Sequence, residues 1–123
     1  MSKKIVVVPG DGIGPEIVSS AVRIIKKVLK ESGINIEFTE KLAGGAAIDK
    51  FGEPLPSDTV NAAKSADATL LGAVGGPKWD NVEPNLRAEK AILGLRKALG
   101  LYANLRPVRV PESMAIHSPL KKE

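Results

Sequence analysis

A short strand pattern followed at once by a glycine-rich loop constrains the fold of this chain more than any other feature. The run Lys4–Val8 is rich in β-branched residues, as is typical of a parallel strand buried on both faces. The loop Pro9–Gly14 follows, and Pro15 stands where the first residue of a helix tolerates a missing N–H. Pro15–Ser32 has the periodicity of an amphipathic helix packed on a sheet, and Ile34–Glu40 alternates like a strand. This order predicts an α/β fold with a mostly parallel sheet flanked by helices.

Further elements are expected along the rest of the chain. They are a brief helix over Ala43–Phe51, a helix capped by Ser57 and reaching about Ser65, a strand over Ala68–Val74, a long loop over Gly75–Arg87 (the Gly75 loop), a helix over Ala88–Leu99 and a strand over Tyr102–Val110. Residues 111–123 contain no clear element, although Ser118-Pro119 could begin a helix.

Ligands of open parallel sheets bind beyond the carboxyl ends of the strands. Three segments leave those ends here: Pro9–Gly14, the Gly75 loop and the residues after Val110. Long connections inside a compact domain are usually functional or disordered. The Gly75 loop is therefore a candidate ligand-binding segment.

Composition argues against several classes of site. The chain has no cysteine and a single histidine, which excludes disulfides and thiolate chemistry and argues against zinc. The aspartates lack metal-ligand spacing. The net charge of +4 comes from dispersed basic residues, and the few aromatics (3%) form no stacking stripe, so we expect no nucleic-acid partner. The N-terminus has neither a long apolar run nor a signal-peptide pattern, so we expect a cytoplasmic protein without a membrane span.

The glycine loop is similar to two phosphate-binding signatures but matches neither. The dinucleotide fingerprint would need glycine at the position of Pro15, and no Gly-Lys-Ser/Thr follows as in a P-loop. Two interpretations stay open. The glycines could merely permit a sharp turn, or the N–H groups at the start of the helix could meet an anionic or polar ligand.

The helix expected over Ala88–Leu99 carries the strongest candidate binding residues. Residues three and four apart share a helix face. Four residues meet this condition: Glu89, Ile92, Leu93 and Arg96. Arg106 follows on the next element, and two guanidinium forks can converge on one anion because each matches a carboxylate. We hypothesise that a small dicarboxylate binds here with an apolar branch against the two aliphatic side chains.

A less specific interpretation of the same helix stays open. Glu89 could simply favour the positive end of the helix dipole, and Ile92 and Leu93 could belong to the core. Against this, Leu95 and Leu99 form the better core stripe, which turns Leu93 away from the interior.

Five stretches together carry a family likeness. They are Val8–Glu16, Leu71–Asp80, Leu95–Lys97, Ala103–Pro107 and Ser118–Lys121. In combination they resemble the 3-isopropylmalate dehydrogenase family, a branch of the β-decarboxylating dehydrogenases. The first stretch is shared with the wider group, which includes isocitrate dehydrogenase, whereas the second and third are more specific to the isopropylmalate branch.

The resemblance implies an NAD-dependent oxidative decarboxylation of (2R,3S)-3-isopropylmalate in leucine biosynthesis, assisted by Mg²⁺ or Mn²⁺ in a homodimer. It implies that Arg96 and Arg106 hold the malate carboxylates and that Ile92 and Leu93 meet the isopropyl group. The residues it implies on the cofactor side are Gly76, Pro77, Lys78, Trp79, Asp80 and Glu89, the last beside the nicotinamide ribose. An isocitrate carboxylate would instead face the apolar pair without a partner.

Members of this family are far longer, and the resemblance has consequences for what this chain lacks. In the family a third substrate arginine, the catalytic tyrosine and lysine, the metal aspartates and the adenosine-binding loop all lie further along. We therefore expect an N-terminal portion that is inactive alone, with no catalytic residue and no metal ligand of its own. The resemblance implies that residues 1–110 form the N-terminal α/β part of the large dehydrogenase domain and that residues 111–123 begin the second domain. The alternatives are a related enzyme acting on homoisocitrate, tartrate or isocitrate, and a non-catalytic carboxylate-binding or assembly module.

Overall fold

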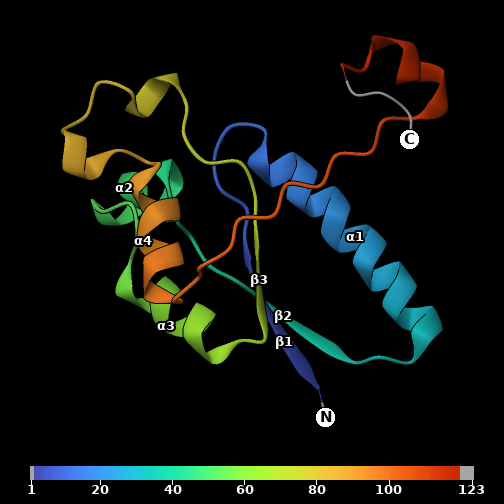
Figure 1. Ribbon diagram of the computed structural model, residues 1–123. Helices are drawn as coiled ribbons and strands as arrows, with labels where there is room; N and C mark the ends of the chain where they lie inside the picture. The colour runs from blue at the N-terminus through green and yellow to red at the C-terminus, as the bar shows by residue number, and fades with distance from the viewer. Residues whose placement is uncertain (1, 120–123) are drawn as a thin grey trace.

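The protein is described by a computed structural model that covers residues 2–119 (Figure 1). Its elements, in order, are β1 (Lys3–Val8), α1 (Gly14–Ser32), β2 (Ile36–Glu40), α2 (Gly45–Phe51), α3 (Ser57–Ser65), β3 (Ala68–Leu71), the 3-10 helices η1 (Pro77–Trp79) and η2 (Pro84–Leu86), α4 (Lys90–Ala98) and the 3-10 helix η3 (Glu112–His117). The predicted alternation of strands and helices is confirmed as far as α4.

The three strands form one parallel sheet in the order β2-β1-β3. The central strand is the most apolar, as two buried faces require: Val6, Val7 and Val8 are all buried. Helix α1 lies on one side of the sheet, and α2, α3 and α4 lie on the other (Figure 1). This arrangement confirms the predicted α/β fold with a parallel sheet flanked by helices.

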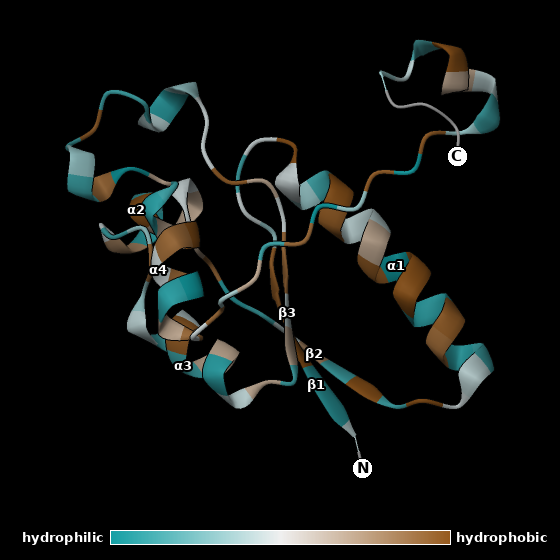
Figure 2. Cartoon of the chain, in the orientation of Figure 1, coloured by the Kyte–Doolittle hydropathy of each residue, from teal (hydrophilic) through white to brown (hydrophobic). Residues whose placement is uncertain are grey.

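The core lies between the sheet and α2–α4 and is built from small aliphatic side chains. Its buried members include Val6, Val8, Ala43 and Ala91. Figure 2 shows hydrophobic residues on the central part of the sheet and in bands along α1, alternating there with hydrophilic ones. One buried polar group, the hydroxyl of Thr59 in α3, donates a 2.7 Å hydrogen bond to the carbonyl of Leu42. That bond removes most of the cost of burying the hydroxyl.

Helix α1 packs less completely than its amphipathic pattern predicts. On its apolar face Val18 is buried, but Ile17 and Val28 are 48% and 58% exposed. A cavity of about 730 Å³ lies between α1 and the sheet, and Val18, Val22 and Phe38 are among the residues that line it. None of the helices between residues 2 and 119 combines the length and apolar content needed to cross a bilayer.

The prediction of a strand over residues 102–110 is wrong. Residues 101–110 contain no regular element and are exposed throughout, and no strand of the described chain lies beside them to supply hydrogen bonds. A strand is stable only when it is paired, so the alternating pattern alone does not produce one. Residues 111–119, where no clear element was expected, contain η3. The last residues, 120–123, lie outside the described chain.

Several element ends differ from the prediction by one to three residues; for example, β2 begins at Ile36 and α2 at Gly45. Strand β3 stops at Leu71, because the chain then turns to contact the glycine loop, and α4 begins at Lys90. Ser57 is the first residue of α3 rather than its cap; Pro56 occupies the cap position, without a side-chain hydrogen bond.

Candidate functional site

The loops that leave the carboxyl ends of the strands meet around the carboxylate of Asp11. This side chain is buried, with 4% exposure. Its Oδ2 accepts hydrogen bonds from the backbone N–H groups of Gly45 (2.7 Å) and Gly75 (2.9 Å), and its Oδ1 accepts one from Ala46 (2.7 Å). Three segments that are distant in the sequence are thus joined at one carboxylate.

Asp11 also supplies the cap that α2 lacks locally. The first N–H groups of a helix have no partner inside it, and no side chain adjacent to α2 satisfies them. Gly45 and Ala46 are the first two residues of α2, and Asp11 accepts from both. A carboxylate at this position is favoured by the positive end of the helix dipole as well.

The glycine loop makes the approach to β3 possible. Gly10 has φ +79°, and a Cβ there would overlap the carbonyl oxygen of Ala73. The same carbonyl accepts the backbone N–H of Asp11 at 2.7 Å. The turn interpretation of these glycines therefore has a specific basis, namely close contact between two backbones; the ligand interpretation stays a prediction.

Gly75 brings a second carboxylate to the same place. It has φ +101°, and a Cβ built there would lie 2.5 Å from Glu89 Oε1. The side chain of Glu89, at the N-terminal end of α4, thus lies directly against Gly75, whose N–H is bound to Asp11. Sequence reasoning selected Glu89 but not its contact with this loop.

The η1 segment is attached to α2 through Asp49. Lys78 Nζ lies 2.5 Å from Asp49 Oδ2, and the indole N–H of Trp79 donates to Oδ1 at 3.2 Å. The Trp79 ring lies against the Cα of Gly45, where a Cβ would overlap it. The hydrogen bond from Lys78, and then that from Trp79, holds the pKa of the Asp49 carboxyl below its ordinary value. Of the other residues expected on the cofactor side, Gly76 is half-buried, and Pro77 and Asp80 are exposed.

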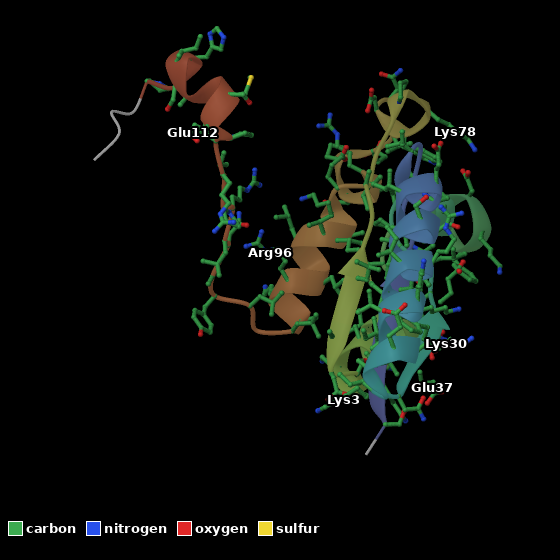
Figure 3. The ribbon with its side chains drawn as sticks, turned by 90° about the vertical axis from the view of Figure 1, so that its right-hand side faces the viewer. Lys3, Lys30, Glu37, Lys78, Arg96 and Glu112 are labelled. Carbon is green, nitrogen blue, oxygen red and sulfur yellow. The ribbon has the colours of Figure 1, made fainter. Side chains whose placement is uncertain are left out.

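Helix α4 separates a core face from an outward face. Ala91 and Leu95 are buried, which confirms Leu95 as a core residue, and Leu99 is half-buried. Leu93 is 63% exposed, and Ile92 and Arg96 are half-buried. Figure 3 shows Arg96 on the side of α4 that faces the segment 101–110 rather than the sheet.

The structure does not bring Arg106 to a binding partner. It lies in the exposed segment 101–110, which extends away from α4 toward η3 (Figure 3). Within the described residues, the guanidinium groups of Arg96 and Arg106 have no carboxylate or hydrogen-bond partner, which leaves both available to an anion. The cavity beside α1 is lined by none of the predicted site residues. The convergence of the two arginines stays a prediction.

Two residues that organise this region, Asp11 and Asp49, were missed by sequence reasoning. Asp11 carried a signal: it is a lone carboxylate within a loop of glycines, next to N–H groups that need acceptors. Asp49 carried none, because a lysine or tryptophan thirty residues away can be recognised as its partner only in three dimensions.

The chain matches known proteins along almost its whole length. The family model for isocitrate/isopropylmalate dehydrogenase covers residues 4–123. A 3-isopropylmalate dehydrogenase from Clostridium pasteurianum is 58% identical over 98% of this chain, and one from Bacillus subtilis is 56% identical over all of it. The chain spans only about 34% of the length of each of these relatives.

A solved structure agrees with the sequence comparisons. The β-decarboxylating dehydrogenase from Thermococcus kodakarensis is 35% identical, with a TM-score of 0.66, over 81% of this chain and 27% of the other.

Proposed function

The chain belongs to the isocitrate/isopropylmalate dehydrogenase family, and from this premise we propose that it supplies part of the active site of an NAD-dependent 3-isopropylmalate dehydrogenase. The proposed reaction is the oxidative decarboxylation of (2R,3S)-3-isopropylmalate in leucine biosynthesis. Because the chain spans about a third of its relatives, this activity is proposed for a longer protein that contains these residues.

The observation that most supports this substrate is the outward face of α4. Leu93 is 63% exposed on the same helix face as Glu89 and Arg96, so this helix presents an apolar side chain between a carboxylate and a guanidinium. An exposed aliphatic side chain between a carboxylate and a guanidinium fits a ligand that is both anionic and branched. Burying an isopropyl group would contribute roughly 2 kcal/mol, at about 0.8 kcal/mol per carbon.

Each proposed residue has a distinct task. Arg96 and Arg106 bind the two carboxylates and fix the orientation of the substrate, and Ile92 and Leu93 exclude water from its branch. When bound, NAD would supply the hydride acceptor needed to oxidise the hydroxyl-bearing carbon of the substrate. Glu89 is exposed beside Gly75, which has no side chain to obstruct a ligand, so its carboxylate fits a hydrogen bond from a ribose hydroxyl.

The chain offers less toward the divalent metal that the family implies. Among residues 2–119, no group of three His, Asp or Glu side chains lies close enough together to hold an ion. We therefore propose that the ligands for Mg²⁺ or Mn²⁺ come from the rest of the longer protein. We propose likewise that residues 1–123 alone do not turn over substrate, and that residues 111–123 begin a second domain.

Substrate profiling of the full-length protein tests the proposed function. We expect NADH formation with 3-isopropylmalate and at least about tenfold lower kcat/KM with isocitrate, homoisocitrate or tartrate. Leu93→Ser should lower kcat/KM for isopropylmalate about tenfold, whereas Lys90→Ser, an exposed position on the same helix, should have little effect. A protein that prefers one of the other acids, or that binds isopropylmalate without turnover, would contradict the proposal.

The arginine pair is tested separately. Arg96→Ala and Arg106→Ala should each lower kcat/KM for isopropylmalate by about 10- to 100-fold, because a hydrogen bond to a charged group contributes about 1.5–3 kcal/mol. Lys97→Ala is the matched control, since it removes an exposed positive charge next to Arg96. If the control costs as much as either variant, the arginines contribute only general positive charge.

A further inference from the structure

We infer that Asp11 is a positioning residue for Glu89 and that it acts through Gly75. The inference rests on the proposed function, in which Glu89 meets the cofactor. Asp11 itself touches neither ligand in that proposal: it is buried, and its carboxylate is occupied by backbone N–H groups. Its role would be to fix the loop against which Glu89 lies.

The carboxylate of Asp11 is held by backbone amides rather than by a cation. Its three donors are the N–H groups of Gly45, Ala46 and Gly75, at 2.7–2.9 Å. No ion pair joins it to a lysine or arginine of the described chain. Two of the donors open α2 and the third opens the Gly75 loop, so a single charged group ties these two segments together.

Gly75 needs such a tie because of its own conformation. Glycine rotates more freely than any other residue, and a φ of +101° is one that it alone adopts readily. The hydrogen bond from its N–H to Asp11 fixes the peptide plane on one side. On the other side the Glu89 carboxylate lies against its Cα, so rotation of this residue would displace Glu89 directly.

A positioning role for Asp11 predicts a change in ligand binding that a purely structural role would not produce. Loss of a helix cap lowers stability but leaves the affinity of a folded enzyme for its ligands unchanged. Loss of a positioning contact changes the binding of the ligand whose site has moved. Because Glu89 is on the proposed cofactor side, we expect the effect on the KM for NAD and not on that for isopropylmalate.

The first measurement needs no variant. In the ligand-free full-length protein, the N–H of Gly75 should exchange with solvent at least about tenfold more slowly than that of Gly76, for which the structure gives no acceptor. Equal exchange of the two amides would overturn the inference, whatever the substrate of the enzyme proves to be.

The second measurement uses two substitutions. Asp11→Ala should raise the KM for NAD about 100-fold, and Asp11→Asn, which retains an acceptor oxygen, should raise it about tenfold, with the KM for isopropylmalate within twofold of wild type. Asp67→Ala is the control, since Asp67 also accepts a backbone N–H, that of Lys4, but at an exposed position. If Asp11→Ala does not fold, Asp11→Asn carries the test.

The outcomes separate this inference from the proposed function. A wild-type protein without isopropylmalate activity refutes the proposed function, and the Gly75 exchange measurement still decides whether Asp11 holds the loop. An active protein whose Asp11→Asn variant keeps the wild-type KM for NAD refutes the positioning role alone. Equal rises in both KM values would also refute it, because they would indicate general disruption.

Discussion

The loops at the carboxyl end of the sheet and the segment that follows α4 differ in how their positions are determined. The loops are joined by buried hydrogen bonds to Asp11 and by close backbone contacts at Gly10. Residues 101–110 are exposed along their whole length, with Tyr102 fully exposed and Leu105 86% exposed. Both regions carry proposed binding residues, Glu89 beside the first and Arg106 in the second.

The difference shows which part of the proposed site this chain can organise by itself. Glu89 lies against Gly75, which is bound to Asp11, so each contact that places it comes from residues 2–119. Arg106 has no such contacts, and apolar neighbours in its segment, such as Val108 at 85% exposure, remain uncovered. If the proposed longer protein forms this site, contacts that place Arg106 must come from residues outside those described here.

The largest effect that separates the regions is expected at Gly10. Alanine in a left-handed conformation costs about 1–2 kcal/mol, and overlap with the Ala73 carbonyl should add about 1–3 kcal/mol. Gly52→Ala is the matched control, because Gly52 has φ +78° but no atom within 4 Å of the added methyl group. Urea unfolding of both variants should give a larger loss for Gly10→Ala. Equal losses would mean that the loops are not tightly packed.

A second contrast is expected within α4, between a core residue and an exposed one. Leu95 is 4% exposed, so Leu95→Ala should lower the free energy of unfolding by about 2–5 kcal/mol. Leu93 is 63% exposed, so Leu93→Ala should cost less than about 0.5 kcal/mol. Thermal unfolding of the two variants measures the difference. A large cost at Leu93 would place it in the core and weaken the proposed substrate contact.

The secondary structure of the strands, α1 and α4 is predicted well from the sequence, because the patterns that indicate it involve residues close together in the chain. Hydrophobic periodicity and glycines identify β1, α1 and β2, and the spacing of Leu95 identifies the buried face of α4. These patterns depend on residues close together in the chain. The same local argument placed Glu89 and Leu93 on one helix face, away from Leu95, and the exposure of Leu93 agrees with it.

Features that depend on distant partners were not predictable in this way. The strand expected over residues 102–110 has an alternating pattern but no neighbour to pair with in the described chain. Asp11 receives hydrogen bonds from residues 34, 35 and 64 positions away, which no spacing rule reveals. Helix α1 lies where it was predicted, but the exposure of Ile17 and Val28 on its apolar face could not be read from periodicity, which does not say what packs against that face.

In the exposed segment, truncating a leucine to alanine should have almost no effect on stability. Leu105→Ala, in a chain of residues 1–123, should change the free energy of unfolding by less than about 0.5 kcal/mol, because the side chain is 86% exposed. Urea unfolding beside Leu95→Ala provides the scale. A loss of unfolding free energy above about 1 kcal/mol would show that residues 101–110 pack against the rest of the protein. It would then remove the contrast between the two regions.

The smallest expected effect concerns η1, which is attached to α2 by exposed charges rather than by a buried carboxylate. The pKa of Asp49 is held below its ordinary value of 3.8, first by the Lys78 hydrogen bond and then by that of Trp79. A carboxyl whose pKa is lower in the folded state stabilises that state above its ordinary pKa, and this contribution disappears as the pH falls through the folded pKa. The attachment of η1 should therefore weaken only in acid, below about pH 4.

Carboxyl-carbon NMR titration measures this directly. Lys78→Met keeps the length of the side chain but removes the principal donor, so the pKa of Asp49 should rise toward its ordinary value. The pKa of Asp67, lowered chiefly by Lys3, is an internal control and should not change. If Asp49 titrates unchanged in Lys78→Met, its partner is not Lys78. In that case the proposed cofactor loop depends on Asp11 and the Trp79 contact with Gly45 for its position, and the contrast between buried and exposed attachments becomes sharper.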